Sequence, residues 1–170
     1  MTEDWGTGIF IDKTAIVHKL VDIQASTRGA RIVVGPDSKI DAFVKIKPTG
    51  GLADVVIGAR CYINSCTVFY SGNGIRIGDD VLIGPNVSIV PINHAYDRDD
   101  VTIKSQGYAP SKGGITIGND VWIAAGCTIL DGAKIGDGAV IGAGSLVVGE
   151  IEPYSVNIGS PAKPVASRKK

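Results

Sequence analysis

The hydrophobic positions of the chain recur every six residues. From residue 117 the rows read IGNDVW, IAAGCT, ILDGAK, IGDGAV, IGAGSL and VVGEIE, with no insertion between them. An apolar lead residue opens each row, and the fifth residue of a row is usually Ala, Val, Thr, Ser or Cys. A period of six is neither the period of a helix nor that of a plain alternating strand. It predicts a short strand followed by a tight turn.

The rows form groups of three along most of the chain. These groups cover residues 11–28, 34–51, 57–74, 77–94, 117–134 and 135–152. Their eighteen lead positions are fourteen Ile, three Val and one Phe. Three rows close one triangular coil, and stacked coils pair their strands in parallel, about 4.8 Å apart. The sequence therefore predicts an all-β solenoid of about six coils, a single domain over residues 1–170, with a protruding loop at 95–116 and a C-terminal tail at 153–170.

Glycine is unusually frequent, at 23 of 170 residues, about twice the average share. Seven glycines stand directly after a lead residue: Gly35, Gly58, Gly78, Gly84, Gly118, Gly136 and Gly142. Because glycine adopts positive φ at little cost, we expect these seven to bend the chain through positive φ.

Charge and cysteine content exclude several classes of protein. The 17 basic and 17 acidic residues give no net charge, which argues against a dedicated nucleic-acid binder. No apolar run approaches the length of a membrane span, and the acidic, polar N-terminus is unlike a secretory signal. Cys61, Cys66 and Cys127 cannot all pair and form no CxxC motif. We therefore expect a cytoplasmic protein whose cysteines are inert packing residues.

The longest break in the repeat, residues 95–116, follows His94, one of only two histidines. Long loops inside a compact repeat are usually functional. An imidazole titrates near neutral pH and is suited to removing a proton from a hydroxyl group. His94 is therefore the candidate general base.

Several short segments around this loop resemble one known family. They are Asn93-His94-Ala95-Tyr96-Asp97, Gln106-Gly107, Gly118-Asn119-Asp120-Val121-Trp122-Ile123, Pro153-Tyr154-Ser155-Val156 and Gly159-Ser160-Pro161-Ala162-Lys163. They resemble the maltose, galactoside and polysaccharide O-acetyltransferase branch of the bacterial hexapeptide-repeat transferases. The resemblance covers about residues 11–165 and implies a left-handed parallel β-helix. The helical N-terminal segment of maltose-type enzymes is not found, which favours the shorter acetyltransferases of polysaccharide and O-antigen gene clusters.

The resemblance implies transfer of an acetyl group from acetyl-CoA to a hydroxyl of a sugar or oligosaccharide, in bacterial surface-polysaccharide synthesis and without a metal. It gives His94 the role of general base in a homotrimer with active sites between subunits. The implied coenzyme A contacts are Ala124, Ala125, Gly142, Ala143, Lys163 and Arg168. The implied acceptor contacts are Asn64, Asn93, Tyr96, Asp97 and Trp122.

The phase of the repeat supports a site between subunits. His94 ends its coil, at the corner between the third and first faces, whereas Asn64 and Trp122 fall near the corner between the first and second faces. These corners are one face apart, on the order of 15–20 Å at the rise of a strand. We therefore expect a threefold trimer to bring the His94 corner of one chain to the Trp122 corner of the next.

Structural alternatives remain open for individual residues. Trp122 also suits packing at a subunit interface, Asn64 suits a structural asparagine stack, and Arg168 suits a solvated tail.

Three other functions also remain open. An N-acetyltransferase acting on an amino-sugar nucleotide uses the same base. A zinc γ-carbonic anhydrase shares the fold but requires three histidine ligands, and this chain has only His18 and His94. A non-catalytic scaffold usually lacks both the base and the loop.

Overall fold

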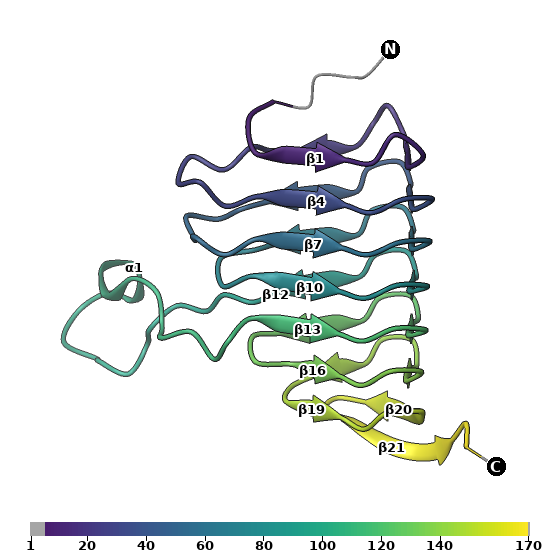
Figure 1. Ribbon diagram of the computed structural model, residues 1–170. Coiled ribbons are helices and arrows are strands. Elements are labelled where there is room, and N and C mark those ends of the chain that lie inside the picture. The colour runs from purple at the N-terminus through teal and green to yellow at the C-terminus, as the bar shows by residue number, and fades with distance from the viewer. Residues whose placement is uncertain (1–5, 170) are drawn as a thin grey trace.

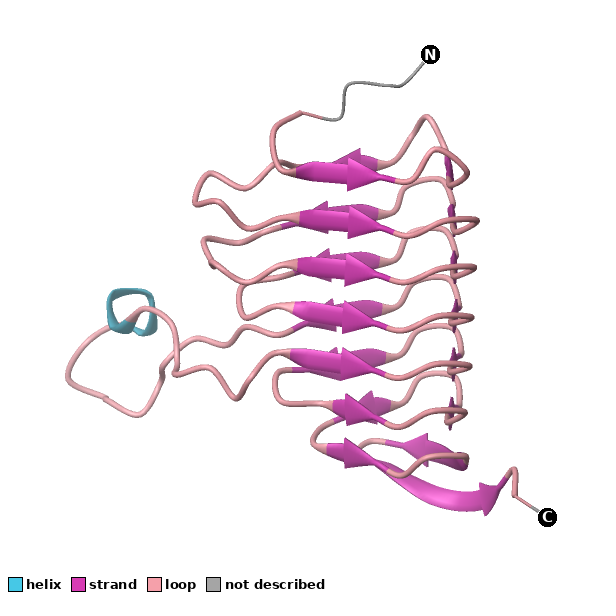
Figure 2. Cartoon of the chain, viewed as in Figure 1, coloured by secondary structure: helices cyan, strands magenta, loops and turns pink. Residues whose placement is uncertain are grey.

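The computed structural model describes residues 6–169, which form a left-handed β-helix with three parallel sheets as its faces (Figure 1 and Figure 2). The first sheet contains β1 (Ile9–Ile11), β4 (Ile32–Val34), β7 (Val55–Ile57), β10 (Ile75–Ile77), β13 (Ile115–Ile117), β16 (Lys134–Ile135) and β19 (Glu150–Ile151). The second contains β2 (Ile16–Val17), β5 (Lys39–Ile40), β8 (Tyr62–Ile63), β11 (Leu82–Ile83), β14 (Trp122–Ile123), β17 (Val140–Ile141), β20 (Ser155–Gly159) and β21 (Ala162–Ser167). The third contains β3 (Asp22–Ile23), β6 (Lys45–Lys47), β9 (Val68–Tyr70), β12 (Ser88–Val90), β15 (Thr128–Leu130) and β18 (Leu146–Val147).

The lead residues of successive coils stack in register and form the core. Ile57 pairs with Ile77, and Ile77 pairs with Ile117, in the first sheet. Every lead residue from Val34 onward is buried. Burial of one such aliphatic side chain contributes roughly 1.5–3 kcal/mol. The predicted fold of about six triangular coils is therefore confirmed.

The turns between the sheets form the three edges of the prism, and we name each edge after the two sheets that it joins. The first–second edge includes turns 58–61, 78–81, 118–121 and 136–139. The second–third edge includes turns 64–67, 84–87, 124–127 and 142–145. The third–first edge, on the left of Figure 1, includes turns 24–31, 48–54, 71–74, 91–114 and 131–133. All insertions into the repeat thus lie on the third–first edge.

The long insertion is shifted from its predicted bounds, because β12 ends at Val90 and the last two predicted loop residues belong to β13. β13 begins at Ile115, so the long loop covers residues 91–114 rather than 95–116. This loop contains the single-turn helix α1 (Ile103–Gln106). Within residues 6–169, no helix has the length and apolar character needed to cross a membrane.

The glycines that follow the lead residues do not have positive φ, so that prediction was wrong. Positive φ occurs instead at the fourth residue of a row, for example at Asp80 (59°) and Gly126 (70°). The second-position glycines are needed because the next coil lies so close. A Cβ on Gly58 would lie 2.4 Å from the carbonyl oxygen of Gly78. The same construction at each of the seven glycines gives a contact of 2.9 Å or less.

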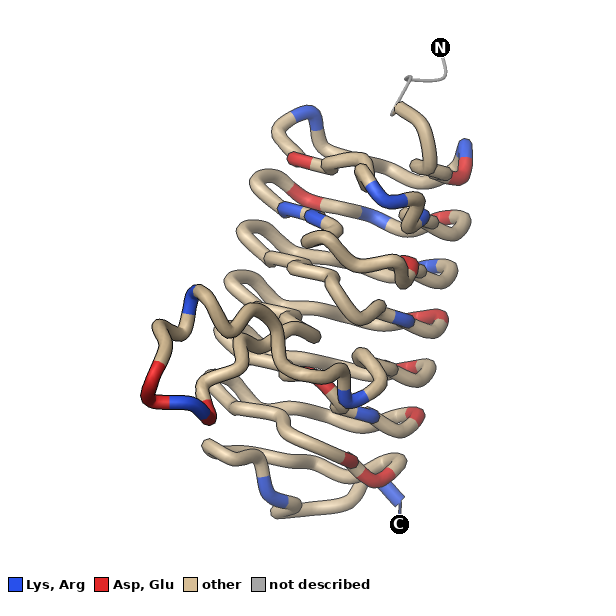
Figure 3. Tube along the Cα trace, turned by 90° about the vertical axis from the view of Figure 1, so that its left-hand side faces the viewer, with Lys and Arg blue, Asp and Glu red and all other residues tan. Residues whose placement is uncertain are grey.

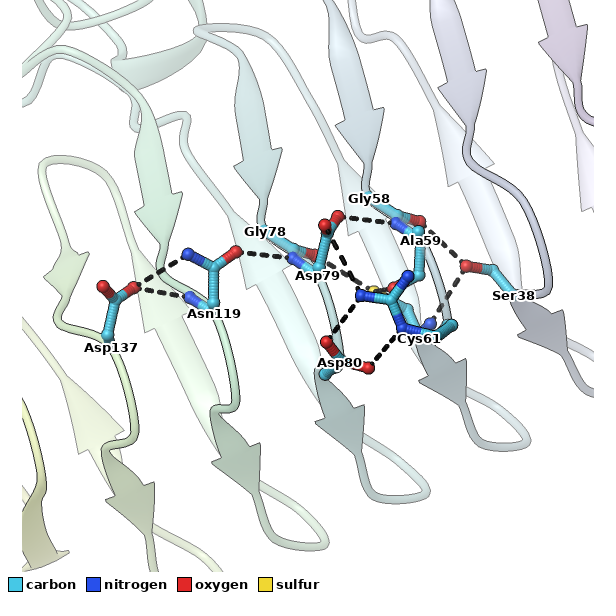
Figure 4. Close-up of polar contacts among 10 residues, drawn as sticks. Ser38, Gly58, Ala59, Cys61, Gly78, Asp79, Asp80, Asn119 and Asp137 are labelled. Carbon is cyan, nitrogen blue, oxygen red and sulfur yellow. Dashed lines mark hydrogen bonds and ion pairs between the residues drawn. The ribbon is translucent and has the colours of Figure 1, made fainter.

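A ladder of side-chain acceptors joins successive coils along the first–second edge (Figure 4). The Ala59 N–H donates to Asp79 Oδ1 at 2.8 Å, and the Asp79 N–H donates to Asn119 Oδ1 at 2.8 Å. The Asn119 N–H then donates to Asp137 Oδ1 at 2.7 Å. Each acceptor directly follows a second-position glycine. The ladder therefore satisfies turn N–H groups and fixes how one coil lies on the next.

The segment predicted as a tail over 153–170 contains a β-hairpin at residues 155–167. β20 continues the second sheet in parallel with β17, and β21 returns antiparallel to β20. The hairpin lies across the C-terminal end of the prism (Figure 1). It packs close to the neighbouring coil, because a Cβ on Gly142 would lie 2.9 Å from the Ile158 side chain.

Candidate active site

His94 lies on the third–first edge, where the long loop leaves the coil, as the sequence predicts. A short antiparallel bridge joins His94 to Tyr108 across the two limbs of the loop. Beside it, the Ala95 N–H donates to the Gly107 carbonyl oxygen at 3.0 Å. The Tyr108 ring stacks on the imidazole, with the ring centroids 5.0 Å apart. The loop therefore holds an exposed imidazole in a defined position.

The loop also selects one neutral form of the imidazole. His94 Nδ1 lies 3.1 Å from the Gly107 carbonyl oxygen. Because a carbonyl oxygen only accepts hydrogen bonds, Nδ1 carries the hydrogen in the neutral ring. The lone pair is then on Nε2. His94 is consequently arranged to take up a proton at Nε2.

Hydrogen bonds inside the loop keep its outer part folded. Gln106 Nε2 donates to the Arg98 carbonyl oxygen at 2.9 Å, and Gln106 Oε1 accepts from the Arg98 N–H at 3.2 Å. Arg98 Nε donates to Asp100 Oδ1 at 2.9 Å. Thr102 caps α1 by accepting the Ser105 N–H. The loop therefore stands out from the prism as an ordered arm with charges of both signs (Figure 3).

The remaining loop residues predicted to contact the acceptor surround His94 in the chain. The Asn93 carbonyl oxygen accepts from the Ala109 N–H at 2.8 Å, which adds to the bridge between the limbs. Asp97 is exposed, and Tyr96 is 78% exposed. Asn93, Tyr96 and Asp97 thus share the third–first edge and its loop with His94.

The small residues predicted to line a coenzyme groove lie together on the second–third edge. Ala124 and Ala125 begin the turn after β14, and Gly142 and Ala143 begin the turn after β17. The two turns are adjacent in the stack, because the Gly144 N–H donates to the Ala125 carbonyl oxygen at 2.9 Å. Ala125 and Ala143 are exposed. This edge therefore presents a continuous strip of backbone that no large side chain covers at these two turns.

Asn64 lies on this second–third edge as well, and its predicted place near the first–second corner was wrong. β8 ends at Ile63, so Asn64 begins the turn toward the third sheet. Asn64 Nδ2 donates to the Ile83 carbonyl oxygen of the next coil at 2.8 Å. This bond agrees with the structural alternative for Asn64, in which the amide joins neighbouring coils.

Lys163 and Arg168, which the sequence grouped together, lie at opposite edges of the second sheet. Lys163 pairs with Ile158 near the hairpin turn, at the end of the second–third edge. Arg168 lies at the first–second edge. Its Nη1 donates to the Gly138 carbonyl oxygen at 2.8 Å and lies 3.1 Å from Asp120 Oδ2. The Arg168 side chain is thus held against two turns of the prism and does not belong to a solvated tail.

Trp122 lies on the outer face of the second sheet and is 51% exposed. It stands in register between Leu82 and Val140, so three apolar side chains follow one another along this face. They line a shallow pocket of about 240 Å³ together with Asp80, Asp120, Val121 and Arg168. This pocket is an apolar surface with charged groups at its margin.

The predicted site residues thus divide into separate groups within one chain. His94 and its loop are on the third–first edge, whereas Ala124 and Gly142 are on the second–third edge. The third sheet separates these edges by on the order of 15–20 Å. Trp122 lies on yet another face, the second sheet. The separation of His94 from Trp122 agrees with the expectation from the repeat phase.

Sequence reasoning missed the partners of His94. The Gln106-Gly107 pair stood out as part of a motif, but the contact between the Gly107 carbonyl and the imidazole depends on the path of the loop. Tyr108 gave no signal of its stacking role. Among residues 6–169, no three His, Cys, Asp or Glu side chains gather in a way that could hold a metal ion.

Two segments match known sequence families. Residues 114–149 match the bacterial transferase hexapeptide family (six repeats), and residues 53–91 match the hexapeptide repeat of succinyl-transferase. The repeat of this chain is therefore similar to that of the hexapeptide-repeat transferases. This confirms the family resemblance on which the left-handed fold was predicted.

Two curated relatives and one solved structure illustrate the similarity. The probable acetyltransferase Rv3034c of Mycobacterium tuberculosis is 31% identical over 95% of this chain and 50% of its own length. The galactoside O-acetyltransferase of Escherichia coli is 36% identical over 65% of this chain and 53% of its own length. AntD, an N-acyltransferase from Bacillus cereus solved with dTDP and 3-hydroxybutyryl-CoA, has a TM-score of 0.79 at 21% identity, covering 95% of this chain and 85% of AntD.

The chain spans about half the length of these curated relatives. The likeness to AntD, at 21% identity, concerns the fold.

Proposed function

We propose that the chain is an acetyl-CoA-dependent acetyltransferase that acetylates a hydroxyl of a sugar or oligosaccharide in bacterial surface-polysaccharide synthesis. The observation that carries the proposal is the contact between His94 Nδ1 and the Gly107 carbonyl oxygen at 3.1 Å, which leaves Nε2 free to act as a base. The acetyltransferase names of the curated relatives support the class of reaction.

The proposed reaction is direct transfer with His94 as general base. Nε2 takes the proton of the acceptor hydroxyl while the hydroxyl oxygen attacks the thioester carbonyl carbon. The Gly107 carbonyl accepts a hydrogen bond from Nδ1–H and so keeps the ring in one orientation while Nε2 takes the proton. The C–S bond then breaks, and the coenzyme A sulfur takes the proton back from Nε2. Backbone N–H groups of a small-residue turn are suited to stabilise the intermediate oxyanion.

The donor is proposed to lie along the second–third edge. The small residues Ala124, Ala125, Gly142 and Ala143 leave room for the narrow pantetheine chain. Lys163, at the hairpin end of this edge, is proposed to bind the coenzyme A phosphates as a point charge. For Arg168 to bind the phosphates, its hydrogen bond to the Gly138 carbonyl oxygen and its ion pair with Asp120 would first have to break. Lys163 is therefore the basic residue that the contacts favour for this role.

The complete site is proposed to form between subunits of a threefold homotrimer. His94 and Trp122 lie on different parts of the prism. In the proposed trimer, one chain therefore supplies His94 and its neighbour supplies the second sheet that carries Trp122. The apolar row around Trp122 would then face the neighbouring loop. A trimer of this 17.6 kDa chain has a mass of about 53 kDa. Sedimentation equilibrium should give this value.

The activity is tested by following release of the coenzyme A thiol with a panel of acceptors. His94→Ala should lower kcat by about 10²–10⁴-fold, the usual contribution of a general base. His18→Ala is the matched control. His18 lies in the first coil, where its Nδ1 accepts the Leu20 N–H. Activity that survives His94→Ala would refute the role of the base.

The acceptor panel also separates the alternatives. If acetyl is transferred only to an amino-sugar nucleotide, the activity is N-acetylation and not the proposed O-acetylation. Calorimetry that finds no binding of coenzyme A would favour a non-catalytic scaffold.

A further inference from the structure

A buried carboxylate lies on the third–first edge, at the turn that follows β15. Asp131 is only 6% exposed. Its Oδ2 accepts from the Lys112 N–H at 2.8 Å and from Asn73 Nδ2 at 3.1 Å. Its Oδ1 accepts from the Gly114 N–H at 3.0 Å. Because an ionised carboxylate only accepts hydrogen bonds, these three donors match its chemistry and compensate for its burial.

The donors come from two different segments. Asn73 belongs to the 71–74 turn of a preceding coil, whereas Lys112 and Gly114 belong to the limb by which the long loop returns to β13. The Gly132 N–H also donates to the Gly114 carbonyl oxygen at 2.8 Å. A Cβ on Gly114 would lie 2.4 Å from the Asn73 carbonyl oxygen. The return limb is therefore enclosed between two turns, with the Asp131 side chain bonded to both the limb and the Asn73 turn.

This return limb is the segment that holds the imidazole. Gly107, which contacts His94 Nδ1, and Tyr108, which stacks on the ring, both precede Lys112 on the same limb. The position of the ring therefore depends on where Asp131 fixes the limb.

We propose that Asp131 is a positioning residue for His94, acting through the return limb of the loop. The inference rests on the proposed function only where it concerns catalysis, since the anchoring of the loop is measurable without activity.

The test compares Asp131→Asn with a control that loses a similar interaction elsewhere. The control is Asp137→Asn. In wild type, Asp137 resembles Asp131 because its carboxylate accepts hydrogen bonds from a backbone N–H of a neighbouring coil and from an asparagine Nδ2, both of Asn119. Asp137, however, lies on the first–second edge, away from the loop. Hydrogen–deuterium exchange of peptides from residues 95–110 and steady-state kinetics are measured for both variants and for wild type.

In Asp131→Asn an NH₂ group replaces one of the two carboxylate oxygens. Because both oxygens accept a backbone N–H in wild type, one of these N–H groups then faces a donor and loses its acceptor. We expect faster exchange in the loop and a fall in kcat of roughly tenfold or more, since small displacements of a catalytic group are costly. The KM for acetyl-CoA should change by less than about twofold, because the small-residue strip assigned to the donor lies on another edge. Asp137→Asn should leave both the loop exchange and kcat near wild type.

Asn73→Ala covers the case in which Asp131→Asn fails to fold. It removes one donor and keeps the two backbone bonds, so the same changes should occur to a smaller degree. Loop exchange as slow as in wild type in the folded variants would overturn the anchoring. Faster exchange with an unchanged kcat would overturn the positioning role. Absence of acetyl transfer in wild type would count against the proposed function instead, while the exchange data would still decide the anchoring.

Discussion

The close approach of successive coils predicts a large cost for one added methyl group at the second position of a row. In Gly58→Ala the new Cβ would lie 2.4 Å from the Gly78 carbonyl oxygen and 2.5 Å from Asp79 Oδ1. An ordinary contact of this kind is at least 3.4 Å. The carbonyl belongs to a backbone fixed by neighbouring strands on both sides, so relief of the overlap requires the coils to separate locally.

The size of the effect follows from comparison with Gly126→Ala. Overpacking of a rigid interior costs about 1–3 kcal/mol, and we expect Gly58→Ala to lower the free energy of unfolding by about 3 kcal/mol. At Gly126, where φ is +70°, a new Cβ would have no atom within 4 Å. Left-handed backbone strain there costs about 1–2 kcal/mol, and the lower entropy of the unfolded chain offsets about 0.4–1 kcal/mol. Gly126→Ala should therefore cost about 0–1.6 kcal/mol.

Urea unfolding followed by circular dichroism measures both variants, at one protein concentration because an oligomer couples folding to association. The comparison is valid if the slope against urea is unchanged between variants. Equal losses of stability, or a larger loss for Gly126→Ala, would refute the conclusion that second-position glycines are required by contact between coils.

Two further predictions concern titratable groups. Burial raises the pKa of the Cys61 and Cys127 thiols, whereas Cys66 is exposed. A thiol reagent should therefore modify Cys66 rapidly in the native protein and the other two only on unfolding; rapid reaction of all three would contradict the packing. Asp54 accepts hydrogen bonds from the side chain of Arg31 and from its backbone N–H. These bonds, the side-chain ones more strongly, lower the pKa of Asp54 below its ordinary 3.8. Asp54 should thus stabilise the fold above that value, with the contribution lost as the pH falls through the folded pKa. Asp54→Asn should flatten the fall in stability as the pH drops below about 3.8, measured by thermal unfolding. A dependence of stability on acidic pH that is the same as in wild type would contradict this role.

The six-residue pattern predicted the triangular coils and their stacking, whereas the left hand of the helix followed from the family resemblance. Lead aliphatics such as Ile83 and Ile123 recur in phase over adjacent coils, and only a triangular solenoid buries all of them. The pattern could not assign the cause of the glycine column, because a periodic glycine fits either a positive φ or a close contact. Gly58 illustrates the point, since its constraint comes from Gly78 in the next coil rather than from its own backbone.

The site was predictable only in part for a related reason. His94 could be found because it stands at the break in the repeat, and its edge follows from its phase. Its orientation depends on Gly107 and Tyr108, which the loop brings back to it by a path that no period describes. Arg168 likewise falls outside the repeat, in a hairpin whose strands reverse direction. Its bonds to Gly138 and Asp120 could not be inferred from its basic character alone.

The formation of the active site between subunits is tested most directly by mixing two impaired variants. His94→Ala and Trp122→Ala homotrimers should each have low activity, because every site lacks one of the two groups. After unfolding and joint refolding at a ratio of one to one, about one quarter of the sites should combine an intact His94 with an intact Trp122 from the neighbouring chain. Activity should then recover to about one quarter of the wild-type value. Activity that stays at the level of the separate variants would contradict a site shared between subunits.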